Sequence, residues 1–384
     1  MHDISVIVPL YRGGKYIDRL IGMFDECSRK LQESFLGYTV ELTFVNDSPD
    51  NTIDAEAIRR PLSMQVKVLE PGMHQGIHGS RLYGLKHTNS EFVLFFDQDD
   101  HVEHSYFSDQ LPHMAGKDGV VCNGTYRSGR LIYDDNRPMA LTFDRKTLLE
   151  KQGNPLSPGQ VLLRRNAIPV EQWARHVLSH NLVDDWLLWF LMASNHCEFG
   201  YNPSVLYEHC ENDLNSSLNW SEMRASRLEL LDALRELDLL SPTELVDLER
   251  TTERYSEKYS SYIKLDELLS SVRADDLVNR VRNYVAGKTL AIYGLGIYGE
   301  RLLSTLRQAS CNIAYAIDRQ ADSLQTTHPN LQLFKASEGM YPAVDLIVVT
   351  PTFAYQQVIS TSLANMECSI LPLDEFLSAC LRDG

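Results

Sequence analysis

Three acidic residues within four positions form the strongest chemical signal in the sequence. The apolar run at residues 92–96 is followed by Asp97, Gln98, Asp99 and Asp100. In an extended chain, side chains two positions apart point to the same side, so Asp97 and Asp99 can converge. Clustered carboxylates repel one another unless a cation compensates them, and their oxygens suit Mg²⁺ or Mn²⁺. The structural alternative is a turn in which these acids cap a following helix.

A second acidic pair precedes a long apolar segment. Asp184 and Asp185 stand directly before the apolar run at residues 186–193. Acidic residues in the first turn of a helix are stabilised by the helix dipole, which by itself would explain the pair.

Glycines with GxGxxG spacing follow a strand pattern near the carboxyl-terminal end of the sequence. Gly294, Gly296 and Gly299 come directly after residues 289–293, and Asp318 ends the next apolar run. In dinucleotide-binding folds such glycines allow a tight turn, close approach of phosphate and helix packing, and the acid binds ribose. The pattern predicts a Rossmann-like topology with a candidate second nucleotide site at these four residues. NAD(P) would be the cofactor of such a site, but no partner for hydride transfer is evident, and we do not expect redox catalysis.

Alternating apolar runs and helical stretches must position the acidic groups of the first region, residues 1–215. The expected strands are residues 4–8, 40–45, 66–69 and 92–96, and the expected helices between them are residues 16–31 and 79–87. This alternation predicts an α/β domain with a mostly parallel sheet covered on both faces. Residues 216–287 lack strand patterns and read as a helical connector, with helices at 221–240, 243–262 and 264–285. The alternation returns over residues 288–384, which predicts a second, smaller α/β domain.

Composition narrows the classes of function. The chain has 384 residues and a formal net charge of −16, so its field would repel nucleic acid, and we expect no nucleic-acid partner. The longest apolar run is far shorter than the roughly 20 residues that a membrane-spanning helix needs. The seven cysteines are scattered, and the amino-terminal residues show no basic leader followed by an apolar stretch. We therefore expect a cytoplasmic protein.

The order and spacing of several motifs resemble the family 2 glycosyltransferases, which have the GT-A fold and usually invert the anomeric centre. The resemblance covers roughly residues 3–215. It implies transfer of a sugar from a nucleoside diphosphate sugar, with uridine diphosphate the expected carrier, to a hydroxyl of a glycan or polysaccharide. The motifs that carry it are Pro9-Leu10-Tyr11, Asp47-Ser48, residues 76–81, Asp97 to Asp100, and Asp184-Asp185.

The resemblance implies nucleotide-binding roles for residues that match the family motifs. Tyr11, in the segment that begins with Pro9, would lie beside the base of the donor, and Asp47 would accept a hydrogen bond from that base. Arg81 would lie near the diphosphate, and Asp97 near the ribose.

The resemblance also implies the residues that perform the chemistry. Asp99, together with Asp97, would hold Mg²⁺ or Mn²⁺, and His209 is a further candidate ligand of the metal or the diphosphate. The alternative for His209 is a hydrogen-bonded structural histidine. Asp185 would be the general base with Asp184 as its neighbour, and one base opposite the leaving group gives a single displacement with inversion.

Three positions depart from the family pattern and keep other functions open. Arg12 and Leu82 stand where asparagine is usual, and His74 stands where asparagine is common. A degenerate transferase domain would give a non-catalytic nucleotide-binding regulator or scaffold. An oxidoreductase built on the glycine motif is a third interpretation, and it would leave the acids of the first region without a role.

The family resemblance and the helical connector are the features of the sequence that bear on partners other than the sugar donor. Lipid-linked acceptors are common in this family, so the resemblance also allows peripheral contact with the inner face of a membrane. The helical connector suits either packing against one domain or contact between subunits, so a homo-oligomer is compatible with the sequence.

Overall fold

The computed structural model describes residues 2–54, 56, 58, 60–126, 131–133, 143–150, 156–180, 182–210, 220–319, 321–324 and 328–382. The chain divides into two compact units. Unit 1 comprises Met1–Ser217 and Ala225–Thr252, and unit 2 comprises Leu218–Arg224 and Glu253–Gly384. The boundary expected between residues 215 and 216 lies outside the described residues.

Unit 1 is built on a mixed sheet that is mostly parallel, as predicted. Among the described residues the strand order is β3-β2-β1-β4-β7-β6-β8-β5. Neighbours among β1 to β4 pair in parallel, whereas β7 runs antiparallel to both β4 and β6. The strands are β1 (His2–Leu10), β2 (Val40–Asn46), β3 (Met64–Leu69), β4 (Ser90–Phe95), β5 (His101–Val102), β6 (Gly119–Tyr126), β7 (Val161–Arg164) and β8 (Phe199–His209).

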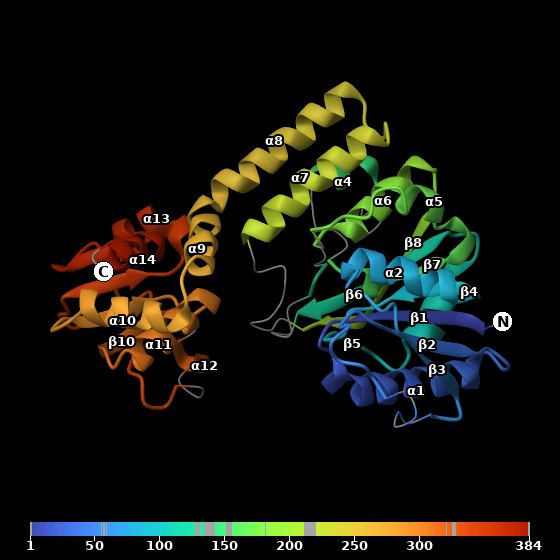
Figure 1. Ribbon diagram of the computed structural model, residues 1–384, viewed down its shortest axis with the longest axis horizontal. Coiled ribbons are helices and arrows are strands. Elements are labelled where there is room, and N and C mark those ends of the chain that lie inside the picture. Colours follow the sequence, from blue (N-terminus) through green and yellow to red (C-terminus); the bar gives the residue numbers. More distant parts are fainter. Residues whose placement is uncertain are drawn as a thin grey trace. The chain divides into compact units, whose positions relative to one another are not determined.

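Helices cover both faces of this sheet. The chain moves from β1 through α1 (Ile17–Ser34) to β2, and in the opposite direction from β3 through α2 (Gly76–His87) to β4. Right-handed crossovers therefore place α1 and α2 on opposite faces, and Figure 1 shows them on opposite sides of the strands. Further α-helices among the described residues before 200 are α3 (Tyr106–Gln110), α4 (Arg145–Glu150), α5 (Val170–Trp173) and α6 (Asp184–Ser194).

The predicted helical segment after residue 216 contains four helices where three were expected. The stretch expected as residues 243–262 ends earlier, and a new helix begins at Ser260. The helices are α7 (Trp220–Glu236), α8 (Pro242–Lys258), α9 (Ser260–Ser270) and α10 (Ala274–Tyr284). In the described part of the chain, no helix combines the length and apolar character needed to cross a membrane.

Unit 2 holds a smaller sheet in which every described pairing is parallel. Its order, β11-β10-β9-β12-β13, is 3-2-1-4-5 when strands are counted from β9, as in a doubly wound Rossmann-type sheet. The predicted second α/β fold is therefore confirmed. The elements are β9 (Thr289–Tyr293), α11 (Ile297–Gln308), β10 (Asn312–Asp318), α12 (Ala321–Leu324), β11 (Leu333–Lys335), β12 (Leu346–Val349), α13 (Tyr355–Thr361), β13 (Ser369–Pro372) and α14 (Leu373–Arg382).

The glycine motif between β9 and α11 brings helix and loop into close contact. Gly294 has a φ of +91°, a conformation that favours glycine. A Cβ added to Gly299 would lie 2.0 Å from the carbonyl oxygen of Gly294, whereas a Cβ on Gly296 would meet open space. Packing therefore requires glycine at position 299 and leaves room at position 296.

We expect Gly299→Ala to lower the free energy of unfolding of the chain by about 1–3 kcal/mol, the usual cost of overpacking. The measurement is urea denaturation followed by circular dichroism. Gly296→Ala is the matched control and should change stability much less, because its backbone is not left-handed and its Cβ has space. Equal destabilisation by the two variants would contradict this account of the motif.

Candidate active site

A buried arginine connects the two acidic groups that the sequence singled out. Nη2 of Arg81, on α2, lies 2.6 Å from Oδ1 of Asp97, just beyond the end of β4. Its Nη1 lies 2.8 Å from Oδ2 of Asp184, the first residue of α6. Arg81 and Asp184 are only 3% and 2% exposed. One guanidinium therefore holds the strand-end acids and the helix acids in one cluster, which we call the Arg81 bridge.

The close packing of α2 on the sheet places Arg81 at this position. A Cβ on Gly84 would lie 2.4 Å from a methyl carbon of Ile7, so α2 can approach β1 only with glycine there. The carboxyl ends of β1 and β4 meet at the same edge of the sheet, where Phe96 N donates to Ile7 O. Asp97 follows directly, within reach of the arginine.

Asp185 has an unusual electrostatic environment beside the Arg81 bridge. Burial and the negative charge of Asp184 raise the pKa of Asp185 to about 7, although Arg81 acts in the opposite direction. The backbone N–H of Trp186 donates to Oδ1 of Asp185 at 2.8 Å. A carboxylate whose pKa lies near neutrality can both accept and release a proton under ordinary conditions.

Tyr11, Asp47 and His74 gather at the ends of β1 and β2. Tyr11 is 51% exposed, and its ring centroid lies 5.3 Å from that of His74. Nδ1 of His74 lies 2.9 Å from Oδ2 of the buried Asp47, whose other oxygen accepts from Gln75 N at 2.6 Å. Burial raises the pKa of Asp47. An exposed aromatic ring beside a fixed acceptor suits a flat ligand that carries N–H donors.

The acidic loop after β4 is held from several sides. Arg19 of α1 donates to the carbonyl oxygens of Gln98 and Asp100, both at 2.7 Å. Oε1 of Gln98 accepts from Tyr11 N at 3.2 Å, which ties this loop to the end of β1. Ser157 Oγ donates to Oδ2 of Asp97 at 3.3 Å. Both carboxylate oxygens of Asp97 thus have protein partners, because Arg81 binds Oδ1 and Ser157 binds Oδ2.

Asp100 anchors the end of β8, where His209 lies. The hydroxyl of Tyr207 donates to Oδ2 of Asp100, and the N–H of Cys210 donates to Oδ1 at 3.0 Å. Nδ1 of His209 lies 3.3 Å from the same Oδ1. A carboxylate on Nδ1 orients the ring as it does in many metal-binding histidines, but it explains a structural histidine equally well.

Asp99 lies in the same loop and is half-buried. Among the described residues, no group of three or more His, Cys, Asp or Glu side chains is arranged to hold a metal ion. The oxygen donors present suit Mg²⁺ or Mn²⁺, which usually take one or two protein carboxylates and complete their shell with phosphate and water.

The candidate second nucleotide site lies in unit 2. There Oδ2 of Asp318 accepts from the N–H of Leu295 at 2.7 Å, inside the glycine motif. The hydroxyl of Thr350, just after β12, donates to Gly294 O at 2.8 Å. The acid expected to bind ribose thus contacts the backbone of the loop itself.

Sequence reasoning missed several residues that shape the site. Arg19, Ser157 and Tyr207 contact the acidic loop and Gln98 lies within it, yet the sequence assigned no role to any of the four. His74 was noted only as a departure, and it lies against both Tyr11 and Asp47. The available signals were the place of Gln98 inside the acidic motif and that of Tyr207 two positions before His209 on β8.

Removing the arginine should test the Arg81 bridge. We expect Arg81→Met to lower the free energy of unfolding by about 3–5 kcal/mol, because it leaves buried carboxylates without a compensating charge. Urea denaturation of the purified chain measures this. The matched control, Arg29→Met, removes a mostly exposed partner of Asp25 and should cost under about 1 kcal/mol.

A double variant separates charge from packing in this test. Adding Asp184→Asn to Arg81→Met should restore part of the lost stability, since a neutral amide then replaces the unpaired carboxylate. If the two substitutions simply added, the ion pair would not be the source of the stability.

Comparisons with known proteins show what the chain is similar to. Residues 5–169 match the family model described as glycosyl transferase family 2. An uncharacterized glycosyltransferase of Haemophilus influenzae is 25% identical over 211 residues, which cover 54% of this chain and 76% of that protein. The poly(ribitol-phosphate) beta-N-acetylglucosaminyltransferase TarS of Staphylococcus aureus is 33% identical over 111 residues, covering 28% of this chain and only 18% of TarS.

Solved structures of S. aureus TarS 1-349 also align with the chain. The complex with UDP has a TM-score of 0.45 at 18% identity, covering 73% of this chain and 78% of that one. The complex with UDP-GlcNAc has a TM-score of 0.48 at 14% identity, covering 80% and 90%. From the family match over residues 5–169 and the named relatives we conclude that the protein is a glycosyltransferase that is similar to glycosyl transferase family 2 over those residues.

Proposed function

We propose that the chain transfers a sugar from a nucleoside diphosphate sugar, with uridine diphosphate as the carrier, to a hydroxyl of a glycan or polysaccharide, with inversion. The observation that carries this proposal is the Arg81 bridge, because it joins Asp97 and Asp184 in one cluster. A donor held at the strand ends would then face a base at the start of α6. The family match favours this enzyme over a non-catalytic regulator.

The nucleotide half of the donor would bind at the ends of β1 and β2. Tyr11 offers an exposed ring for the base, and Asp47 offers acceptor oxygens beside it. His74 replaces the asparagine common in the family and lies against both residues. Asp97 would lie toward the ribose, as the family resemblance implies.

Asp185 would act as the general base. It would accept the proton of the acceptor hydroxyl while that oxygen attacks the anomeric carbon and the bond to the diphosphate breaks. Asp184 pairs with Arg81, and its negative charge raises the pKa of Asp185. This leaves Asp185 basic enough to take a proton near neutral pH.

Asp99 would be the protein's main ligand for Mg²⁺ or Mn²⁺, with Asp97 beside it and His209 as a further ligand. When bound, the ion would offset the charge that develops on the leaving diphosphate. Arg81 already forms ion pairs with two carboxylates. Its guanidinium would therefore act on the diphosphate by long-range electrostatic attraction and not by a direct hydrogen bond.

Substituting the acids separately should distinguish their roles. Asp185→Asn should lower kcat by about 10²–10⁴-fold at saturating metal, the usual contribution of a general base. Asp99→Asn should instead raise the Mn²⁺ concentration needed for half-maximal rate. Both are measured by release of the nucleoside diphosphate in a screen of donors and acceptors. Asp232→Asn, on an exposed face of α7, is the control and should change neither quantity. Wild-type turnover by Asp185→Asn would refute its role as base.

The pH dependence should follow the titration of Asp185. Because the base must be deprotonated and its pKa is about 7, kcat/KM should rise about tenfold per pH unit below that value and level off above it. Rates measured from pH 5 to 9 at saturating metal test this expectation. A flat profile across neutrality would contradict the assignment.

A further inference from the structure

In unit 2, aromatic side chains of the chain itself lie across the place where the glycine motif would receive a nucleotide. The crevice beyond β9 and β12 is the point where this sheet reverses its strand order, the usual ligand site of such folds. The hydroxyl of Tyr262, on α9, donates to Thr350 O at 3.0 Å. Its ring stacks on Tyr298 in the first turn of α11, with centroids 4.8 Å apart and planes 8° from parallel.

Buried hydrogen bonds fix this arrangement. The hydroxyl of Tyr298 donates to Oδ1 of Asp266 at 2.8 Å, and Oδ2 of the same residue accepts from Trp220 N at 2.7 Å. The N–H of Leu295 is already bonded to Asp318. One N–H of the glycine motif and one oxygen of Asp318 are thus used within the protein, so we consider other ligand sites in unit 2.

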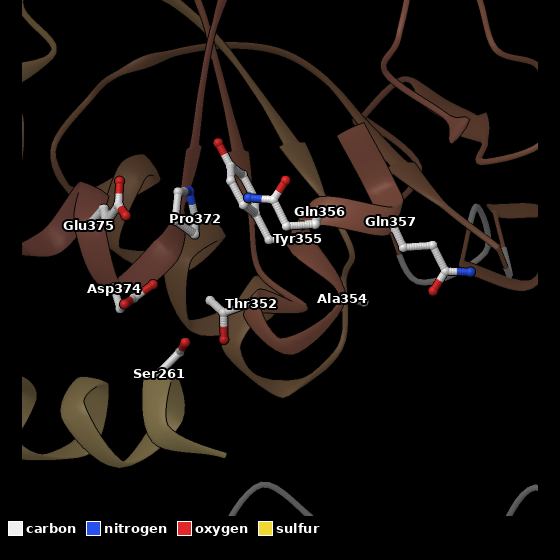
Figure 2. Close-up of a pocket in the computed structure, with 9 residues that line it drawn as sticks. All are labelled: Ser261, Thr352, Ala354, Tyr355, Gln356, Gln357, Pro372, Asp374 and Glu375. Carbon is white, nitrogen blue, oxygen red and sulfur yellow. The ribbon is translucent and has the colours of Figure 1, made fainter. Parts of the chain in front are cut away.

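A cavity of about 510 Å³ lies next to this crevice, at the carboxyl ends of β12 and β13. Its volume is in the range of ordinary small-molecule sites. Figure 2 shows side chains entering it from the segment after β12, from the start of α14 and from Ser261 of α9. The carboxyl ends of parallel strands are where open α/β sheets bind their ligands.

The lining of this cavity selects a class of ligand. Besides the phenol of Tyr355 it contains two carboxylates, two aliphatic hydroxyls and two side-chain amides, and no lysine or arginine among the described residues. Without a cation it would repel phosphate and hence a nucleotide. Carboxylates, amides and hydroxyls instead complement sugar hydroxyls, each of which both donates and accepts. These six polar residues are Asp374, Glu375, Ser261, Thr352, Gln356 and Gln357.

One carboxylate in this cavity lacks the partner that its burial demands. Asp374 is 8% exposed, and its Oδ1 has no hydrogen-bond partner among the residues that the structure describes. Figure 2 shows Asp374, Thr352 and Ser261 pointing toward one another across the cavity. A buried carboxylate oxygen without a donor is costly. Neighbouring atoms cover Oδ1, so a rotation of the Asp374 side chain toward a ligand hydroxyl in the cavity would give this oxygen the donor that it lacks.

We propose that this cavity binds a saccharide through its hydroxyl groups, with Asp374 as the central acceptor. Unit 2 would then be a glycan-binding module within the glycosyltransferase. The site is separate in its residues from the Arg81 bridge, so it can be tested by binding alone.

The test is saturation-transfer difference NMR on the full chain with glucose, N-acetylglucosamine, maltose and ribitol as probes. At least one probe should bind. Asp374→Asn should weaken the affinity of the chain for that probe by roughly tenfold or more, because a charged hydrogen-bond acceptor is lost. Thr352→Val is a second pocket variant, so that a folding defect in one leaves the test intact. Glu367→Gln, an exposed residue of the same unit, and Asp185→Asn should bind as the unchanged chain does.

Three outcomes would overturn the proposal. The first is that none of the four probes binds. The second is that binding survives both pocket substitutions in chains that unfold at the normal temperature. The third is that Asp185→Asn abolishes binding, which would assign the signal to the transfer site. Failure of sugar transfer with intact, pocket-dependent binding would contradict only the proposed enzymatic function.

Discussion

The buried pairing of one guanidinium with two carboxylates is the interaction on which the site in unit 1 depends. Arg81 loses its hydration when it is 3% exposed, and only the simultaneous contacts with Asp97 and Asp184 compensate for that loss. These contacts fix the end of β4 against the start of α6. They also set the electrostatic balance at Asp185, because Asp184 raises its pKa and Arg81 lowers it. Structural stability and the strength of the base thus have a common origin.

The two units use the carboxyl ends of parallel strands in different ways. In unit 1 these ends carry the exposed ring of Tyr11 and the half-buried Asp99. In unit 2 the comparable crevice contains Tyr262, and the accessible polar cavity lies beside it at β12 and β13. Similar sheet topology therefore does not imply similar ligands, since function depends on the side chains at the edge.

Local patterns were enough to predict the elements that begin each unit. The strand pattern at residues 289–293 matches β9, because a short apolar run before a glycine turn acts over few residues. Strand β7 was not expected, since its antiparallel place between β4 and β6 depends on distant pairings. The contact between Arg81 and Asp184 joins residues 103 positions apart, so spacing could not reveal it. Family resemblance identified these residues without their contacts.

The most direct test of the account is a crystal structure of the chain with uridine diphosphate and Mn²⁺. The account predicts anomalous density for the ion at Asp99, the base of the nucleotide at Tyr11 and Asp47, and Arg81 still bonded to both Asp97 and Asp184. Asp185 should face the same cavity as the diphosphate. A nucleotide bound in another crevice, or Asp99 and Asp185 facing separate cavities, would contradict it.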